Sequence, residues 1–214
     1  MPFTLDCRHC ARLAHFLDQV KVAHPEYHAR PVASFGEAGS PLLIVGLAPG
    51  MHGANRTGRP FTGDFAGNLL YGTLHQYGFA TQAEPLDRAG NANADLHLVG
   101  CRITNAVRCL PPQNKPETVE INTCNNYLGD ELAMLPKGAA VMALGTIAHQ
   151  AVLLALKLRK SSYPFSHGAE HLLPGDLTLF DSYHCSRYNT QTKRLTTAMF
   201  ESIIASISGH LGTF

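Results

Sequence analysis

The hydrophobic and polar positions of this chain follow two patterns that alternate along its length. Four short apolar runs are typical of strands buried on both faces, and they cover residues 42–45, 96–104, 138–145 and 177–180. Apolar residues at helical spacing predict helices at 10–22, 65–78, 117–135, 146–158 and 196–211. Asp64 is a suitable N-cap for the second helix, and the third should begin near Thr118. This alternation predicts an α/β fold in one domain, residues 1–214, with a parallel sheet between helices.

The most unusual loops of the chain all follow predicted strands. They cover residues 46–64, 104–116 and 181–192. In parallel sheets, ligands bind beyond the carboxyl ends of the strands. The pattern therefore predicts that these three loops meet at one edge of the sheet and form a binding site.

Composition excludes some classes of protein and leaves the partner open. Of the 214 residues, 45% are hydrophobic and only 15% are charged, which excludes a disordered chain. No apolar run reaches the roughly 18 residues that suggest a membrane span, and the N-terminus does not resemble a secretory signal. The formal charge of +1 selects no partner, although a local basic rim and the twelve histidines would permit DNA binding.

The six cysteines point to metal or redox chemistry, because the absence of a secretory signal suggests a reducing, intracellular compartment. Cys7 and Cys10 form a C-x-x-C pair, and Cys109 and Cys124 are separated by fourteen residues that include a proline-rich loop. Four thiolates can hold zinc or a [4Fe–4S] cluster. The alternative is a set of free, buried cysteines. Cys101, inside an apolar strand, is expected in the core.

The loop after the first strand contains many glycines and one conspicuous aromatic residue. The glycines let the backbone approach a ligand closely, and the backbone amides would favour an anionic group. Phe61 offers a surface on which a flat base would stack. The alternative is a structural loop with Phe61 in the core. A phosphate-binding P-loop is excluded, because the Gly-Lys-Ser/Thr end is missing.

The other two loops contribute polar side chains. Asn105 could bond the edge of a base through its amide, or serve as a turn residue. His184 could donate to a developing oxyanion, or act as a capping or surface histidine. Arg187 and Lys193 could meet phosphates or remain solvated.

Together these segments resemble the uracil-DNA glycosylase superfamily, specifically family 5, the B-type enzymes. The resemblance rests on GLAPGMHGANRTGRPFTGDFAG (46–67), TNAVRCLPPQNKP (104–116), HCSRYN (184–189) and the four cysteines. It implies a three-layer α/β/α sandwich around a four-stranded parallel sheet. It also implies a structural [4Fe–4S] cluster on Cys7, Cys10, Cys109 and Cys124. The usual His-Pro-Ser start of the third motif is here His184-Cys185-Ser186.

The resemblance also implies a mechanism. Family-4 relatives have Glu after the first glycine, whereas Leu47 stands here and the carboxylate is Asp64 of the Gly-Asp pair. Asp64 would stabilise the cationic sugar or orient water, His184 would stabilise the departing base anion, and Asn105 would bond that base. The further expected contacts are Gly46, Ala48, Gly50 and Phe61 with the base, Asn189 with the His184 loop, and Arg56, Arg59, Ser186 and Arg187 with DNA.

The expected substrate is DNA containing uracil or other deaminated bases such as hypoxanthine. No nucleophilic lysine is evident in these loops, so we expect a monofunctional glycosylase, which is typically a monomer in this family. Three competing hypotheses remain: a non-catalytic DNA- or nucleotide-binding module, a hydrolase of free nucleosides, and a structural domain held by zinc.

Overall fold

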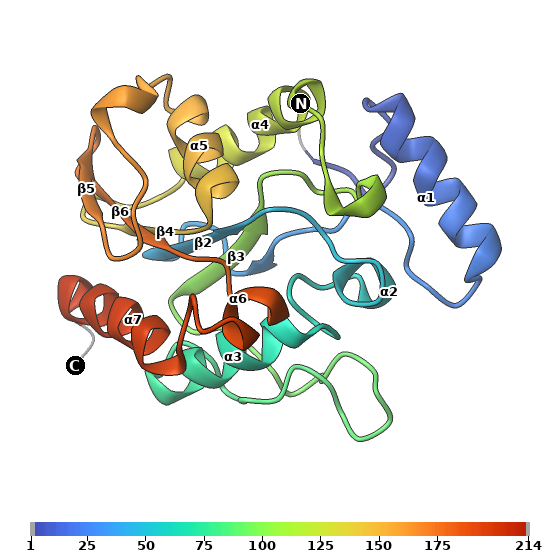
Figure 1. The fold of residues 1–214 in the computed structure, drawn as a ribbon, viewed down its shortest axis with the longest axis horizontal. Coiled ribbons are helices and arrows are strands. Elements are labelled where there is room, and N and C mark those ends of the chain that lie inside the picture. The colour runs from blue at the N-terminus through green and yellow to red at the C-terminus, as the bar shows by residue number, and fades with distance from the viewer. Residues whose placement is uncertain (1–2, 213–214) are drawn as a thin grey trace.

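A six-stranded sheet forms the centre of the protein, as the computed structural model of residues 3–212 shows (Figure 1). The strand order is β1-β3-β2-β4-β6-β5. The strands are β1 (Phe35–Gly36), β2 (Leu42–Gly46), β3 (Cys101–Asn105), β4 (Ala140–Leu144), β5 (Glu170–Leu173) and β6 (Leu177–Ser182). The four inner strands are parallel, as predicted, whereas β1 and β5 pair antiparallel at the two edges.

The two edge strands and one strand boundary differ from the sequence prediction. β1 has only two residues and β5 is mostly polar or exposed, so neither gives the apolar run of a buried strand. The strand expected at 96–104 begins only at Cys101. Gly100 has a left-handed backbone (φ +57°), and Leu98 forms no more than an isolated bridge with Ala80.

Helices cover both faces of the sheet, which confirms the three-layer architecture (Figure 1). The helices are α1 (Ala11–Ala23), α2 (Ala54–Thr57), α3 (Phe65–Gln76), α4 (Thr118–Ala133), α5 (Thr146–Ala155), α6 (Arg187–Gln191) and α7 (Thr197–Leu211), with 3₁₀ turns at Pro112–Asn114 and Lys160–Ser162. α4 and α5 pack on one face, and α3 and α7 pack on the other. α2 and α6 lie inside segments that were expected to be loops.

The alternation of side chains along β2 explains the two cores. Leu42 and Ile44 point into the core shared with α3 and α7, whereas Leu43 and Val45 point into the core shared with α4 and α5. All four side chains are fully buried. An apolar residue at every position is therefore required, because successive side chains of a strand face opposite sides of the sheet.

Local signals set the ends of the helices. The Asp64 carboxylate accepts a hydrogen bond from Gly67 N (3.1 Å) and so caps α3, as predicted. α5 ends three residues before the predicted limit, because Lys157 adopts a left-handed conformation (φ +56°). α7 ends at Gly212, also left-handed (φ +65°), where glycine has no steric penalty.

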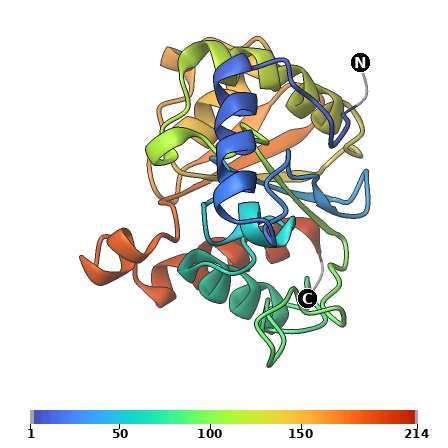
Figure 2. The same ribbon diagram turned by 90° about the vertical axis from the view of Figure 1, so that its right-hand side faces the viewer.

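α1 lies across the side of the molecule, outside the sandwich (Figure 2). Its apolar residues Leu13 and Leu17 pack against Val107 and Leu110 of the loop that follows β3. The N-terminal helix therefore supports the loops at the carboxyl ends of the strands. None of the helices in residues 3–212 combines the length and apolar character needed to cross a bilayer.

Candidate active site

A cavity of about 640 Å³ opens at the carboxyl ends of the parallel strands. The three predicted loops meet there, because β2, β3 and β6 all end at this edge. Eight of the predicted residues line the cavity: Ala48, Gly50, Phe61, Asp64, Asn105, His184, Ser186 and Arg187. Asp64 and His184, 120 positions apart, therefore share one cavity.

Asp64 presents a carboxylate at the start of a helix. It accepts from Gly67 N, and burial raises its pKa above the ordinary value in spite of backbone hydrogen bonds that lower it. Its Oδ2 lies against Gly53, where an added Cβ atom would approach to 2.6 Å. Any residue larger than glycine at position 53 would therefore displace the carboxylate of Asp64.

His184 is held as a neutral imidazole. Burial lowers its pKa to about 4, because the protonated ring would lose its hydration. Its Nδ1 atom is buried without a hydrogen-bond partner. The Asn189 amide donates to the carbonyl oxygen of His184 (2.8 Å), so it fixes the backbone from which the ring projects. A neutral imidazole can donate one hydrogen bond and accept another.

Phe61 packs at the base of the cavity beside His184. The two rings are stacked, with centroids 5.9 Å apart and planes 30° apart. Phe61 has a left-handed backbone (φ +53°), which is unusual for a bulky residue and often marks functional sites. A Cβ atom at Gly46 would lie 2.7 Å from this ring, so glycine is required there although it does not line the cavity.

Asn105 contributes a buried amide that has an unsatisfied oxygen. The residue is 5% exposed, and its Oδ1 has no hydrogen-bond partner. Leaving a buried polar atom unpaired costs about 1–3 kcal/mol. A ligand with a donor group at this position would satisfy it.

The segment after His184 forms the rim of the cavity. Ser186 caps α6 by accepting from Asn189 N (3.4 Å). Arg187 lies exposed over the Phe65 ring, with its guanidinium carbon 5.3 Å from the ring centroid. The guanidinium is thus held at the rim by a cation–π contact and is accessible from outside.

Arg59 and Arg56 make hydrogen bonds within the protein. The three guanidinium nitrogens of Arg59 bond Thr62 Oγ1 and the carbonyl oxygens of Asn93 and Pro85. In this geometry the donors of Arg59 tie the loop to residues 85–93, and the expected contact of Arg59 with DNA stays a prediction. Arg56 similarly bonds the carbonyl oxygens of His52 and Gly90.

The cavity also has lining residues that the sequence interpretation missed. His52 lines it with Met51 and Asn114, and the Tyr27 hydroxyl lies 2.8 Å from His52 Nδ1. His52 belongs to the glycine-rich loop, so its position in the motif was an available signal. The contact with Tyr27 depends on tertiary packing and had no local signal.

Comparison with known proteins places this geometry in a family. The model described as "Uracil DNA glycosylase superfamily" matches residues 33–208. The chain belongs to the uracil DNA glycosylase superfamily. Among members of this superfamily, the chain is 46% identical to a type-5 uracil-DNA glycosylase of Thermus thermophilus, over 92% of this chain and 90% of that protein. Type-5 enzymes of Mycobacterium leprae (40% identity; 92% and 88%) and Pyrobaculum aerophilum (34% identity; 97% and 90%) are also similar.

Elsewhere in this uracil DNA glycosylase fold, four cysteines approach one another between α1 and α4. Cys7, Cys10, Cys109 and Cys124 line one small cavity, together with Tyr127. Burial raises the pKa of Cys124 to about 11 and also raises the pKa of Cys109 and Cys10. All four cysteines are free thiols. Cys101, as expected, is fully buried in the core.

Proposed function

We propose that this protein excises uracil from DNA by hydrolysing the N-glycosidic bond of a flipped nucleotide, leaving an abasic site for repair. The main support is the cavity that joins Asp64, Asn105 and His184, in a chain related to type-5 uracil-DNA glycosylases over nine-tenths of its length. Since its substrate is DNA, the enzyme acts inside the cell.

The flipped base stacks on Phe61 and meets Asn105 and His184 at its polar edge. Uracil carries both a donor and acceptors, so it satisfies the unpaired Asn105 Oδ1. When the glycosidic bond breaks, the base leaves as an anion. The neutral imidazole of His184 donates a hydrogen bond to that anion, and the buried setting strengthens this bond.

Asp64 acts on the sugar side of the bond. Its carboxylate stabilises the cationic sugar or orients the attacking water. Burial raises the pKa of Asp64, so keeping its carboxylate charged in this site costs free energy. That cost is recovered when positive charge develops nearby in the transition state.

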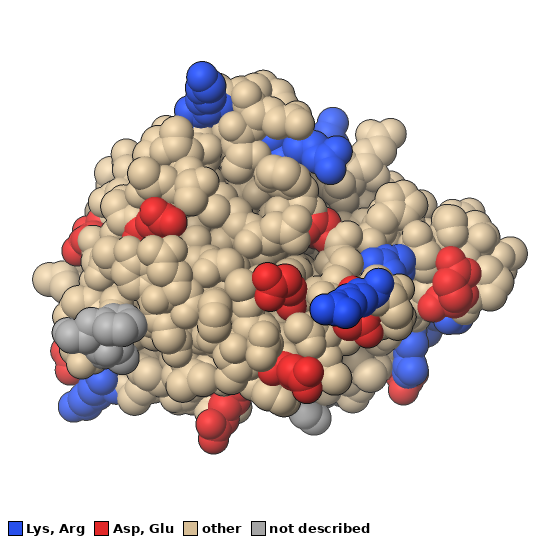
Figure 3. Space-filling view, turned by 90° about the horizontal axis from the view of Figure 1, so that it is seen from below, with Lys and Arg blue, Asp and Glu red and all other residues tan. Residues whose placement is uncertain are grey.

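DNA binding depends on a small basic rim. Arg187 and Ser186, at the start of α6, are the groups that we expect to contact phosphates. The face seen from below, on the side of α3 and α7, carries scattered charges of both signs and no continuous basic area (Figure 3). This agrees with a net charge of only +1 and gives no support for an extended DNA-binding surface on this face.

The range of bases that the enzyme accepts follows from the residues that line the cavity. Apart from Asn105 and His184, the lining residues that we expect to face the base (Ala48, Gly50 and Phe61) are apolar, so other deaminated bases such as hypoxanthine should also be accepted. Among the described residues, no lysine lines it, so the enzyme forms no covalent imine with the sugar and is monofunctional. We expect it to act as a monomer.

Asp64→Asn is the decisive test of this proposal. Asparagine also caps helices, so the fold should be retained, while excision from a U:G duplex falls by at least about 100-fold. Abasic sites are measured on gels after alkali treatment. The matched control is Asp87→Asn, an exposed aspartate that also accepts from backbone amides and should retain full activity. If the variant stays within a few-fold of wild type, the role of Asp64 is wrong. If the wild type leaves no abasic sites, the function is wrong.

We also propose that Cys7, Cys10, Cys109 and Cys124 hold a structural [4Fe–4S] cluster. Four thiols line one cavity, and burial raises the pKa of Cys10, Cys109 and Cys124. Bound iron would stabilise the four sulfurs as thiolates. Tetrahedral zinc would require thiolate sulfurs about 3.8 Å apart. Among the described residues, no three of these sulfurs lie within 4.8 Å of one another. The cluster would join α1 to the loop before α4.

Metal analysis tests the cluster. The purified protein should be brown and contain four irons per chain, and Cys109→Ala should lose both the iron and several degrees of thermal stability. Cys101→Ala, which removes a buried thiol outside the cavity, should keep its iron. A colourless protein with one zinc per chain and full activity would refute the assignment.

A further inference from the structure

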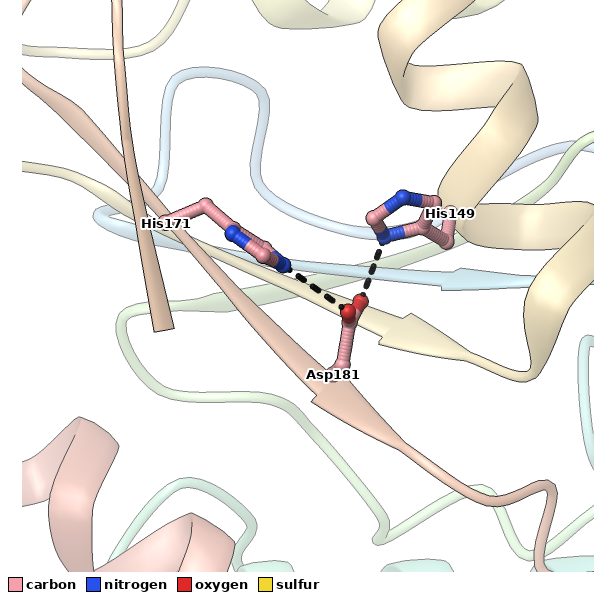
Figure 4. Close-up of side chains that lie close together, drawn as sticks. All are labelled: His149, His171 and Asp181. Atoms are coloured by element: carbon pink, nitrogen blue, oxygen red, sulfur yellow. Dashed lines mark hydrogen bonds and ion pairs between the residues drawn. The ribbon is translucent and has the colours of Figure 1, made fainter. Parts of the chain in front are cut away.

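Two histidines and an aspartate converge on the α5 side of the sheet (Figure 4). His149 comes from α5, His171 from the edge strand β5, and Asp181 from the end of β6. His149 Nδ1 lies 2.7 Å from Asp181 Oδ1, and His171 Nε2 lies 3.2 Å from Asp181 Oδ2. One ligand atom from each of the three residues lies within 4.8 Å of the other two. The cluster is separate from the catalytic cavity, whose lining includes none of these residues.

The hydrogen bonds of His149 require either a proton or a metal ion between its imidazole and Asp181. Its Nε2 faces the carbonyl oxygen of Tyr163 at 2.9 Å, and a carbonyl can only accept, so Nε2 carries a proton. In a neutral ring Nδ1 is then a lone pair that faces the carboxylate of Asp181. Two lone pairs at 2.7 Å repel each other unless a proton or a metal ion lies between them.

The surroundings match those of metal-bound histidines. A histidine that binds a metal usually donates its other ring N–H to a carbonyl or carboxylate, as His149 does to Tyr163. The side chains of His149, His171 and Asp181 are only 2%, 12% and 0% exposed, so water cannot compensate their polar groups. Metal bonds of about 2.1 Å separate adjacent ligand atoms by about 3.0–3.4 Å. The observed nitrogen–oxygen distances of 2.7 and 3.2 Å need only small adjustments to reach this range.

We propose that His149, His171 and Asp181 bind a divalent transition-metal ion, of which zinc is the representative. The ion would connect α5, the edge strand β5 and the end of β6. β6 leads directly to His184, so the ion would also support the segment that carries the catalytic imidazole. Two imidazoles and a carboxylate form a recognised set for this class of metal. The proposal does not depend on the glycosylase function, and its test uses protein in which the four cysteines hold their own metal.

The test adds one equivalent of zinc to the chelator-treated protein that retains its iron–sulfur cluster. Zinc-edge X-ray absorption should show only nitrogen and oxygen neighbours at about 2.0–2.2 Å and none of the sulfur expected at about 2.3 Å. At saturating zinc the thermal midpoint should rise by about 5–10 °C. These measurements use the wild-type chain and need no variant to fold.

A matched pair of variants separates a metal site from a hydrogen-bonded cluster. In His171→Gln the amide still donates to Asp181 but is a poor metal ligand, so the zinc-induced rise should disappear. In His75→Asn, which alters a histidine bonded only to the carbonyl of Ala80, the rise should remain. Sulfur around the zinc, no rise in the wild type, or an equal rise in His171→Gln would overturn the proposal.

Discussion

His184, which is half-buried, and His149, which is buried, lie near the carboxyl edge of the same sheet, and their ring nitrogens differ in their partners. His184 Nδ1 has no partner, and burial lowers the pKa of the ring to about 4. His149 has an acceptor at each ring nitrogen. The first arrangement leaves bonding capacity for a ligand that arrives and departs. The second leaves no ring nitrogen of His149 for a passing ligand, because both are engaged within the fold.

This difference gives a general way to separate functional from structural polar groups. A buried polar atom without a partner costs free energy, so one that belongs to a residue lining a cavity is a candidate ligand contact. Asn105 Oδ1 belongs to this class with His184 Nδ1. The carboxylate of Asp181, with a histidine on each oxygen, belongs to the other. The comparison predicts that variants of His184 and Asn105 will lower the excision rate, whereas variants of the residues around Asp181 will lower stability.

The largest effect on stability is expected for His149→Ala. Removing one partner of a buried carboxylate costs about 3–5 kcal/mol, because Asp181 Oδ1 loses its contact and only His171 remains at Oδ2. The excision rate at a temperature where the variant is folded should stay within a few-fold of wild type. Denaturant unfolding measures the loss of stability, and single-turnover excision measures the rate. His210→Ala, an exposed histidine bonded to the carbonyl of Gly138, should change neither. A large loss of excision rate in folded His149→Ala would contradict the assignment of His149 to stability alone.

The converse result is expected for His184→Ala. Removing a hydrogen bond to a developing anion lowers the rate by about 100- to 1,000-fold. Unfolding at pH 8 should change little by comparison, since the ring nitrogen has no partner in the free protein. His184→Gln restores a neutral donor and should recover part of the rate. Equal rates for both variants would show that the imidazole acts only by filling space.

His184 should also make the stability of the protein depend on pH. The pKa of His184 is about 4 in the folded state and about 6.5 in the unfolded state, so the unfolded state binds more protons between these values. The free energy of unfolding should therefore fall as pH decreases from 6.5 to 4, by up to about 3 kcal/mol. His184→Gln should lose this part of the pH dependence. An unchanged slope in that variant would show that His184 is protonated in the folded protein.

Much of the fold followed from the sequence because its signals are local. The apolar run at 42–45 and the cap at Asp64 depend on neighbouring residues alone, and both occur in the structure. The edge strands β1 and β5 depend on partners distant in the sequence. Their own residues carry no apolar pattern, so no local signal was available.

The site shows the same limit. The motifs predicted which residues share the cavity, including Asp64, Asn105 and His184. They did not predict the internal bonds of Arg59, because its partners Pro85 and Asn93 lie in a loop without a distinctive pattern. Nor did they indicate the cluster around Asp181, whose two histidines come from separate elements. Pairing between distant side chains is a property of tertiary structure.

The smallest effect is expected for Asn105→Ala, and it tests whether an unpaired atom marks a ligand contact. One hydrogen bond to a neutral base is worth about 10-fold in kcat/KM, or roughly 1.4 kcal/mol. Because the free protein leaves Oδ1 unpaired, truncation should not destabilise the fold. Asn114→Ala, at the same cavity but exposed on the 3₁₀ turn, is the matched control and should retain wild-type kcat/KM. Binding to an abasic-site duplex should be unaffected by Asn105→Ala, since that product lacks the base. If affinity for this duplex falls as much as kcat/KM, Asn105 supports the loop and does not bind the base.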